Sequence, residues 1–465
     1  MTNISTPIYI TNFALKEKYT YLNGLGNLHQ SEAFPDAVPL VNSYPQHAKY
    51  GLRSEKVSGT SFTATPRSQN LWSFLYRARP SYNHGTFELW NQHLETANPS
   101  RPKHLTPNSY VWPTFNVTKG DWTAQHLLGG NGSPTDKTGV AIWLFHVNKD
   151  MPPQTVFSSQ DGEALIVPQT GALDIQTEYG KLLVRQQEIA VIPRGIKYRV
   201  TLPEGKEARG YVLELYQGHF RLPELGIIGS IGLANPRDFQ VPTASFDGKI
   251  ESQGDTQVAV ANDGRGEWTI ISRLDTKLWF ATQDSTPFDV AGWQGTLYPY
   301  KYDVRRFNYI GNLNYDHADP SVFVVLTSQS YGKEPGTAVV DFAAVGEHWH
   351  PAQHTLRVPW YHRNTASEFV FPIIAEQDPK SRLNTSDTFG PWGAWLNANM
   401  VTHGSNEQEY AEWQAKDTLT PMKLQDFGVT SAIIETEATL LLTDWAFEAA
   451  TKNFKDQTNA AFEGL

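Results

Sequence analysis

The segment Ala164–Val200 reads ALIVPQTGALDIQTEYGKLLVRQQEIAVIPRGIKYRV and has the most regular pattern in the chain. Short runs of apolar and β-branched residues alternate with glycines at Gly171, Gly180 and Gly195. This arrangement is typical of short β-strands joined by tight turns. It favours a β-sandwich or jelly roll over a fold in which strands and helices alternate.

Strand-like runs recur outside this segment, whereas helical signals are sparse. Further runs cover Gly210–Tyr216, Val322–Thr327 and Ala338–Val345, and the clearest helix is expected over Thr443–Phe454. We therefore predict a mainly β protein.

The composition changes near Tyr300–Phe307 (YKYDVRRF), and we place a domain boundary there. The predicted organisation is a β-rich N-terminal domain, residues 1–300, followed by a catalytic domain, residues 301–465. Six of the fourteen histidines lie after this boundary, which favours the C-terminal domain as the one that carries the catalytic residues.

The composition excludes several classes of function. The chain has 465 residues, 12% of them aromatic, and so predicts a folded protein with a large core. Its formal net charge is −10 and no basic cluster stands out, so neither nucleic acid nor an anionic membrane surface is an expected partner. Because no stretch of about 18 apolar residues occurs, no membrane span is predicted and a cytoplasmic location is expected.

Cysteine is absent, so disulfides, thiolate metal sites and cysteine nucleophiles are excluded, and a bound metal must rely on His, Asp or Glu. His362 and Glu368 can point to one face of a single strand, because side chains alternate with period two. His403 could supply a third ligand from an adjacent strand. Two imidazoles and one carboxylate leave three open positions on iron for substrate and O2. The same spacing also fits surface or core residues, so spacing alone leaves both interpretations open.

Two other histidine clusters compete with this set. The stretch Glu347–His354 (EHWHPAQH) contains a His-x-His pair, His348 and His350, which could bind a metal from one strand face. Pro351 interrupts that strand and no Glu follows, which favours an exposed polar loop that also includes His354.

His317 stands between Asp316 and Asp319, where neighbouring acidic residues could tune it as a general acid/base. A loop histidine capped by Asp fits the same pattern. The chain has no G-x-S-x-G, no P-loop and no strand-associated G-x-G-x-x-G, so other nucleophile and nucleotide sites have little support.

The turn Ile192–Gly195 resembles the second half of a cupin signature, in which a metal-binding His follows the Gly by three positions. This chain has Tyr198 there. The N-terminal domain is therefore expected to be cupin-like and to hold no metal at the usual place.

Several segments occur in the order found in one enzyme family. They are Tyr21–Asn27 (YLNGLGN), Ser58–Thr63 (SGTSFT), Leu75–Arg77 (LYR), Leu165–Gln169 (LIVPQ), Gly232–Phe239 (GLANPRDF), Pro299–Tyr302 (PYKY), Asp316–Ser321 (DHADPS), Tyr361–Asn364 (YHRN) and Ser367–Phe369 (SEF). Over nearly its whole length the chain resembles homogentisate 1,2-dioxygenase.

The resemblance implies an Fe(II) site made by His362, Glu368 and His403, with His317 as the catalytic acid/base beside the substrate ring. It implies a small aromatic substrate with a 2,5-dihydroxyphenyl ring, which O2 opens between the hydroxylated carbon and its substituted neighbour. The implied fold is a β-rich N-terminal domain and a C-terminal jelly roll. The implied assembly is a homo-oligomer, a hexamer of two trimers.

The chain departs from the family in residues of the substrate pocket. Gln377 stands where the family has a substrate-contacting Tyr, Asn397 where it has a His, and Thr402 where a Pro precedes the last ligand. The expected substrate-binding residues are His317, Asn364, Gln377, Asn397 and His403.

Because lost polar partners change specificity by large factors, a related substituted hydroquinone is the alternative substrate to homogentisate. A metal-dependent cupin isomerase or binding protein that does not activate O2 is the alternative from a different class.

Overall fold

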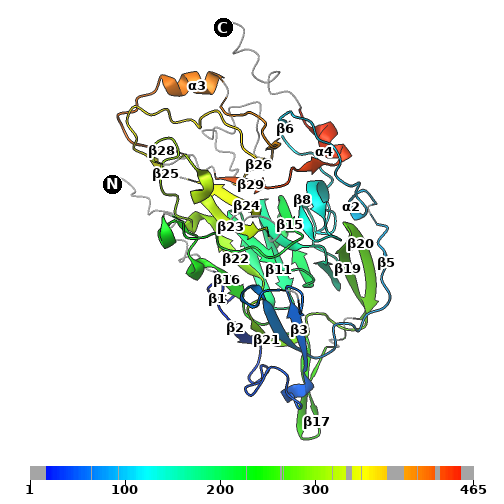
Figure 1. Cartoon of the computed structure of the whole chain (residues 1–465). Helices are drawn as coiled ribbons and strands as arrows, with labels where there is room; N and C mark the ends of the chain where they lie inside the picture. Colours follow the sequence, from blue (N-terminus) through cyan, green and yellow to red (C-terminus); the bar gives the residue numbers. More distant parts are fainter. Residues whose placement is uncertain are drawn as a thin grey trace.

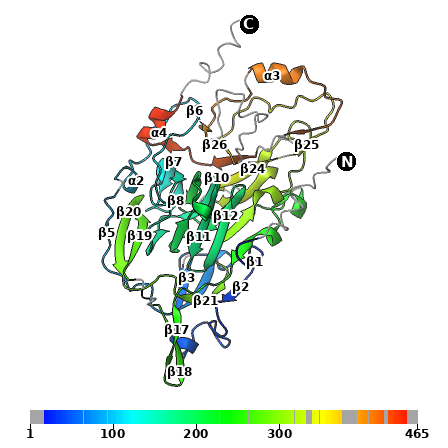
Figure 2. The ribbon, with the colours of Figure 1, turned by 180° about the vertical axis from the view of Figure 1, so that it is seen from behind.

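The structure is a computed structural model of the whole chain (Figure 1). It describes residues 17–63, 65–92, 94–226, 228–261, 264, 266–316, 318–330, 338–346, 348–373, 392–405, 407–424 and 430–451. Helices α3 (Glu407–Gln414) and α4 (Asp444–Ala449) lie at one end of the molecule, and the hairpin of β17 (Lys249–Gln253) and β18 (Thr256–Val260) lies at the opposite end (Figures 1 and 2). The described residues contain one further α-helix, the short α2 (Leu94–Ala97).

Two large sheets form the N-terminal part and share one hydrophobic core. The nine-stranded sheet has the order β1 (Tyr21–Asn23), β16 (Gln240–Pro242), β22 (Tyr300–Asp303), β13 (Glu188–Ile192), β10 (Glu163–Thr170), β15 (Ala208–Leu215), β8 (Thr138–Val147), β7 (His126–Ser133) and β30 (Leu441–Leu442). The seven-stranded sheet has the order β12 (Gly180–Arg185), β11 (Ala172–Thr177), β14 (Tyr198–Thr201), β9 (Thr155–Ser159), β19 (Trp268–Leu274), β20 (Lys277–Gln283) and β5 (Glu88–Leu89).

The glycine-punctuated segment quoted first supplies five of these strands, β10 to β14, as predicted. Gly171 connects β10 to β11 with a φ of +78°, and a Cβ there would lie 2.2 Å from the carbonyl oxygen of Glu207. Only glycine fits this turn without strain. The chain therefore passes from one sheet to the other at Gly171, and the two sheets face each other across the core.

A six-stranded antiparallel sheet carries the C-terminal part. Its order is β23 (Val324–Gln329), β24 (Ala338–Val345), β29 (Ser431–Thr436), β26 (Ser367–Pro372), β27 (Ala394–Asn397) and β6 (Tyr110–Trp112). The edge strand β6 comes from the N-terminal half, and β30 from the C-terminal half completes the nine-stranded sheet. The two halves are interlocked in this way, and the domain boundary at residues 300/301 stays a prediction.

Three smaller pieces complete the described strands. They are a four-stranded sheet of β2 (His29–Glu32), β21 (Val290–Gly295), β4 (Trp72–Arg77) and β3 (Arg53–Ser58), the β17–β18 hairpin, and a ribbon of β25 (His348–His350) and β28 (Met422–Leu424). The prediction of a mainly β fold is confirmed. No helix within the described residues is long and apolar enough to cross a membrane.

The predicted C-terminal helix begins where expected but is shorter. Thr443 precedes α4, and the helix ends at Ala449 rather than at Phe454. A tertiary contact ends the helix early. The backbone of Thr451 pairs with Val111 of β6 through two hydrogen bonds of 2.8 and 3.0 Å. Residues from 452 onward lie outside the described part of the chain.

Tyr198, which stands at the cupin metal position, is 2% exposed and lies in the N-terminal core. Its hydroxyl accepts a hydrogen bond of 3.0 Å from Nε1 of Trp122, and its ring packs edge-on against Phe157. Aromatic packing thus occupies this position.

Candidate metal centre

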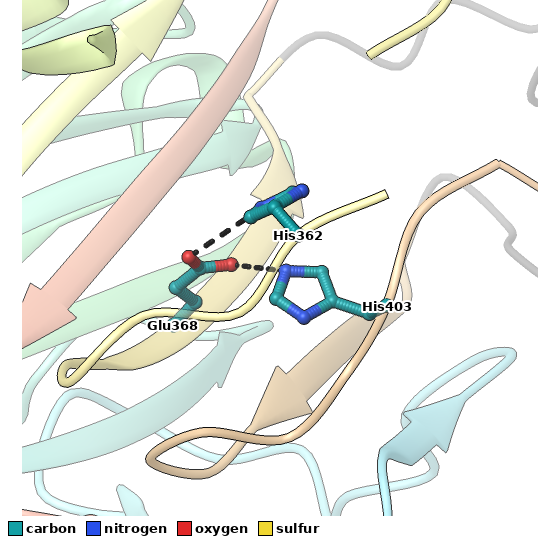
Figure 3. A group of neighbouring side chains, drawn as sticks. All are labelled: His362, Glu368 and His403. Carbon is teal, nitrogen blue, oxygen red and sulfur yellow. Dashed lines mark hydrogen bonds and ion pairs between the residues drawn. The ribbon is translucent and has the colours of Figure 1, made fainter. Parts of the chain in front are cut away.

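Glu368 lies on β26, inside the six-stranded sheet, and His362 and His403 approach it from two extended segments (Figure 3). These segments pair through reciprocal backbone hydrogen bonds between His362 and His403, of 2.9 and 3.0 Å. The prediction that His362 and Glu368 share one strand is wrong in this detail, because β26 begins only at Ser367. The two histidines are instead brought together by the backbone hydrogen bonds between His362 and His403.

The three side chains converge on one point. Nε2 of His403 lies 2.7 Å from Oε2 of Glu368, and Nε2 of His362 lies 3.7 Å from Oε1 (Figure 3). The two imidazole centroids are 4.1 Å apart, and all three ligand atoms lie within 4.8 Å of one another. In the described part of the chain, this is the single group of three or more His, Asp or Glu residues with such geometry.

Backbone carbonyls fix the tautomers of both histidines. Nδ1 of His362 is 3.0 Å from the carbonyl oxygen of Trp360, and Nδ1 of His403 is 2.9 Å from that of Val401. A carbonyl oxygen can only accept, so each Nδ1 carries a proton. Nε2 of each ring therefore faces Glu368. It can donate to the carboxylate when the ring is protonated, and in the neutral ring it has the lone pair that would bind a metal.

The same pair of histidines controls the charge of the carboxylate. Burial alone would raise the pKa of Glu368, but the imidazoles of His362 and His403 lower this pKa to about 2. In return, the carboxylate of Glu368 raises the pKa of His362. The carboxylate is therefore ionised at neutral pH, as a metal ligand must be. Two imidazoles and one carboxylate form a donor set that fits a ferrous ion.

Asn364 supports this carboxylate from the turn between His362 and β26. Its Nδ2 donates to Oε1 of Glu368, and its Oδ1 accepts from the backbone N–H of Ala366 at 2.6 Å. Its carbonyl oxygen accepts from the N–H of Met400 at 2.7 Å, which ties the turn to the segment that carries His403. Asn364 thus links two of the ligand-bearing segments.

Replacing Asn364 with Ala should weaken metal binding by about 10- to 100-fold, the usual cost of losing an outer partner of a metal ligand. The physical reason is that Glu368 loses the donor that fixes its orientation. Calorimetric titration of the metal-free protein with Fe(II) under anaerobic conditions measures the change. Asn83→Ala is the matched control, because that exposed amide is bonded only to Asp284 among the described residues. Equal affinity of the two variants would contradict the assignment.

A row of polar side chains crosses the six-stranded sheet through Glu368. The strand register places Thr327, Asp341, Glu435, Glu368 and Asn397 side by side on β23, β24, β29, β26 and β27. Directly opposed residues of antiparallel strands share a face, so this row is continuous. The sequence interpretation did not single out Glu435 or Asp341, because only the register of strands far apart in the chain brings them next to Glu368.

Glu435, like Glu368, has a strongly shifted pKa, but in the opposite direction. Burial, followed by the negative charges of Glu368, Asp341 and Asp319, raises the pKa of Glu435 to about 7. Glu435 can thus hold a proton at neutral pH beside the candidate metal ligand, and the pKa of Asp341 is raised as well, chiefly by burial.

Replacing Glu435 with Gln should stabilise the metal-free protein in a pH-dependent way. A carboxyl with a raised pKa in the folded state destabilises that state as the pH rises above its ordinary pKa, and the full effect is reached above the folded pKa, here about 7. The variant should therefore melt at a higher temperature than the parent protein at about pH 8, and the difference should shrink toward pH 5. Thermal unfolding followed by circular dichroism measures this, and a difference independent of pH would contradict it.

The other predicted pocket residues fall into two groups. Asn397 is 2% exposed, lies opposite Glu368 and accepts a hydrogen bond of 2.6 Å from Oγ of Ser109. Ser109 comes from the N-terminal half and was missed by the sequence interpretation. His317 and Gln377 lie outside the described residues, so their predicted roles stay predictions.

The rival histidine pair does not join His362, Glu368 and His403. His348 and His350 lie on β25, 8% and 3% exposed, whereas His354 is exposed in the loop that follows. The interpretation of this stretch as an exposed polar loop is wrong for the pair, because pairing with β28 makes a strand that turns both imidazoles inward.

Comparison with known proteins gives a consistent result. The family of homogentisate 1,2-dioxygenase N-terminal regions matches residues 20–304, and that of the C-terminal regions matches residues 305–465. Homogentisate 1,2-dioxygenase of Emericella nidulans is 43% identical over 460 residues, 98% of this chain and 97% of that protein. The enzyme of Caenorhabditis elegans is 40% identical over 439 residues, 92% and 94% of the two chains.

The solved structure of protein Ylba from E. coli matches 75% of this chain and 97% of its own chain at 8% identity, with a TM-score of 0.30. The two family matches together span residues 20–465, and both curated relatives are at least 40% identical over nearly their full length. The chain belongs to the homogentisate 1,2-dioxygenase family.

Proposed function

We propose that the chain is a ring-cleaving dioxygenase that uses Fe(II), held by His362, Glu368 and His403, to open homogentisate or a related substituted hydroquinone. The observation that carries the proposal is the convergence of these three side chains in a member of this family, with both Nε2 atoms facing the ionised carboxylate. When bound, Fe(II) would supply open coordination positions and the one-electron chemistry by which O2 reacts with a closed-shell aromatic ring.

The residues of the chain prepare this site. The carbonyl oxygens of Trp360 and Val401 hold the two imidazoles in the ligating tautomer, and Asn364 orients the carboxylate of Glu368. Because the side chains are already held in place, less free energy is spent on ordering them when a labile ferrous ion binds.

The polar row places side chains on both sides of Glu368, next to the residues that would hold the metal. Glu435 can take up or release a proton near neutral pH, and Asn397, which accepts from Ser109, is a buried polar group opposite Glu368. We propose His317 as the catalytic acid/base, and Asn364, Gln377, Asn397 and His403 as further substrate contacts. We also propose a homo-oligomer, as the resemblance implies, and a cytoplasmic location.

Oxygen uptake by the Fe(II)-loaded protein tests the proposal. Homogentisate, gentisate and a series of substituted hydroquinones should be offered in turn, with mass spectrometry of the product to detect the addition of both oxygen atoms. Consumption of O2 with one of these substrates is the expected result. If iron is bound and none of them consumes O2, the ring-cleavage proposal is wrong.

The same experiment separates the alternative of a cupin isomerase or binding protein. Such a protein would bind or convert the ligand equally well with a redox-inert ion such as Zn²⁺ in the site. A ring-cleaving dioxygenase should be inactive with Zn²⁺ and active with Fe(II).

A further inference from the structure

His348 and His350 form a second cluster of metal-ligating side chains outside the site described above. Both imidazoles are buried on the same side of β25, while Trp349 between them is 62% exposed. Their imidazole centroids are 5.0 Å apart, and the two Nε2 atoms lie 3.1 Å from each other. The pair is therefore already arranged with both Nε2 atoms directed at one point.

The hydrogen bonds of His348 define which of its nitrogens is free. Its Nδ1 donates to the carbonyl oxygen of Gly346 at 2.8 Å, so Nε2 carries the lone pair and points toward His350. Burial, then the neighbouring His348 and Arg357, lowers the pKa of His350 to about 4, and burial also lowers the pKa of His348. Both rings are neutral at neutral pH, which is the form that binds metals.

The 3.1 Å contact can be satisfied in two ways. One is a hydrogen bond from Nε2–H of His350, which leaves the buried Nδ1 of His350 as an acceptor without a partner among the described residues. The other is a metal ion bound by the unprotonated Nε2 atoms of both histidines. With metal–nitrogen bonds of about 2.0–2.1 Å, the observed separation of 3.1 Å corresponds to an angle of about 100° at the ion. That angle lies between tetrahedral and tetragonal coordination.

We propose that His348 and His350 form a second metal site, which takes a borderline ion such as Zn²⁺ or Cu²⁺ through two imidazoles and water. The donor set distinguishes it from the first site, because it contains no carboxylate from the described residues. All-imidazole donors and the order of divalent-ion affinities both favour copper and zinc over ferrous iron. The guanidinium of Arg357 lowers the pKa of His350 and opposes a cation in the same way, so binding should be weaker than at the three-ligand site.

Zinc titration of a protein that lacks the first site tests the proposal. In the His362→Ala/His403→Ala protein, calorimetry should detect one equivalent of Zn²⁺. Adding His350→Gln, or in a separate variant His348→Gln, should remove this equivalent. Adding His354→Gln, the exposed histidine of the same stretch, should leave it unchanged. Circular dichroism confirms that each variant is folded.

Two results would overturn the second site. One is a His362→Ala/His403→Ala protein that binds no Zn²⁺, and the other is unchanged binding after the pair is replaced. The Cu²⁺-loaded His362→Ala/His403→Ala protein gives a measurement that needs no substitution in the pair. Its electron paramagnetic resonance spectrum should show coupling to two nitrogens, and a spectrum of oxygen ligands alone would contradict the proposal.

Discussion

A protein in which Ala replaces His403 should bind Fe(II) at least about a hundredfold more weakly than the parent and should consume no O2. The expected loss exceeds the 10- to 100-fold cost of removing an outer partner, because a direct ligand is removed. It has a second cause, since His403 is also the closer of the two histidines that keep the carboxylate of Glu368 ionised. Without the imidazole, Glu368 becomes a buried carboxyl with one partner fewer and a higher pKa.

Anaerobic Fe(II) titration followed by oxygen uptake measures both effects in one sample. His354→Ala provides the matched control, because it removes an exposed imidazole in the same part of the chain. Stoichiometric iron in the His403→Ala protein would exclude this residue as a ligand, and the assignment of the whole site would then have to be revised.

Replacing Arg77 with Met should destabilise the folded protein by about 3–5 kcal/mol, the cost of leaving buried charges without their partner. Arg77 ends β4 and is 3% exposed. Its guanidinium contacts Asp289 at 2.8 Å, Glu178 at 3.0 Å and Glu55 at 2.6 Å. Asp289 and Glu178 are buried as well, so the variant would leave Asp289 without a cation and Glu178 with Lys197 alone, whose Nζ is 3.7 Å away.

The midpoint of thermal unfolding, measured in the metal-free protein, should fall accordingly. The control lies two residues further along, where Arg79 forms an exposed pair with Asp284. An exposed ion pair contributes at most about 1 kcal/mol, so Arg79→Met should change the midpoint little. Similar shifts for the two variants would show that burial of the Arg77 cluster has no special importance for stability.

The sequence predicts the strands of the N-terminal part because their ends are marked locally. Glycines between β-branched runs determine where β10, β11 and β12 begin and end, and positive φ values at Gly171 and Gly180 explain why. The end of α4 could not be predicted in the same way. It depends on the pairing of Thr451 with Val111, which is a contact between residues far apart in the chain.

In the candidate site, too, some residues can be predicted from the local sequence and others only from contacts between distant strands. Residue type and resemblance suffice to select His362, Glu368 and His403, because imidazole and carboxylate are the ligands that remain in a chain without cysteine. The neighbours of these residues require the register of the sheet. Glu435 enters the site through strand β29, and Ser109 enters it from the residue directly before β6. Nothing in their local sequence marks either residue. The buried state of His348 and His350 likewise depends on pairing with the distant strand β28.

The exchange of edge strands between the two halves has a consequence for biosynthesis. Trp112 of β6 is translated early, but its partner strand β27 begins only at Ala394. At about 5–20 residues per second, the ribosome needs on the order of tens of seconds to cover that interval. During this time Trp112, which is 1% exposed in the final fold, has no sheet to pair with, so the nascent chain displays an unpaired apolar strand to chaperones. The candidate metal centre can form only after this delay, when Glu368, His403 and the strand that borders them are all present.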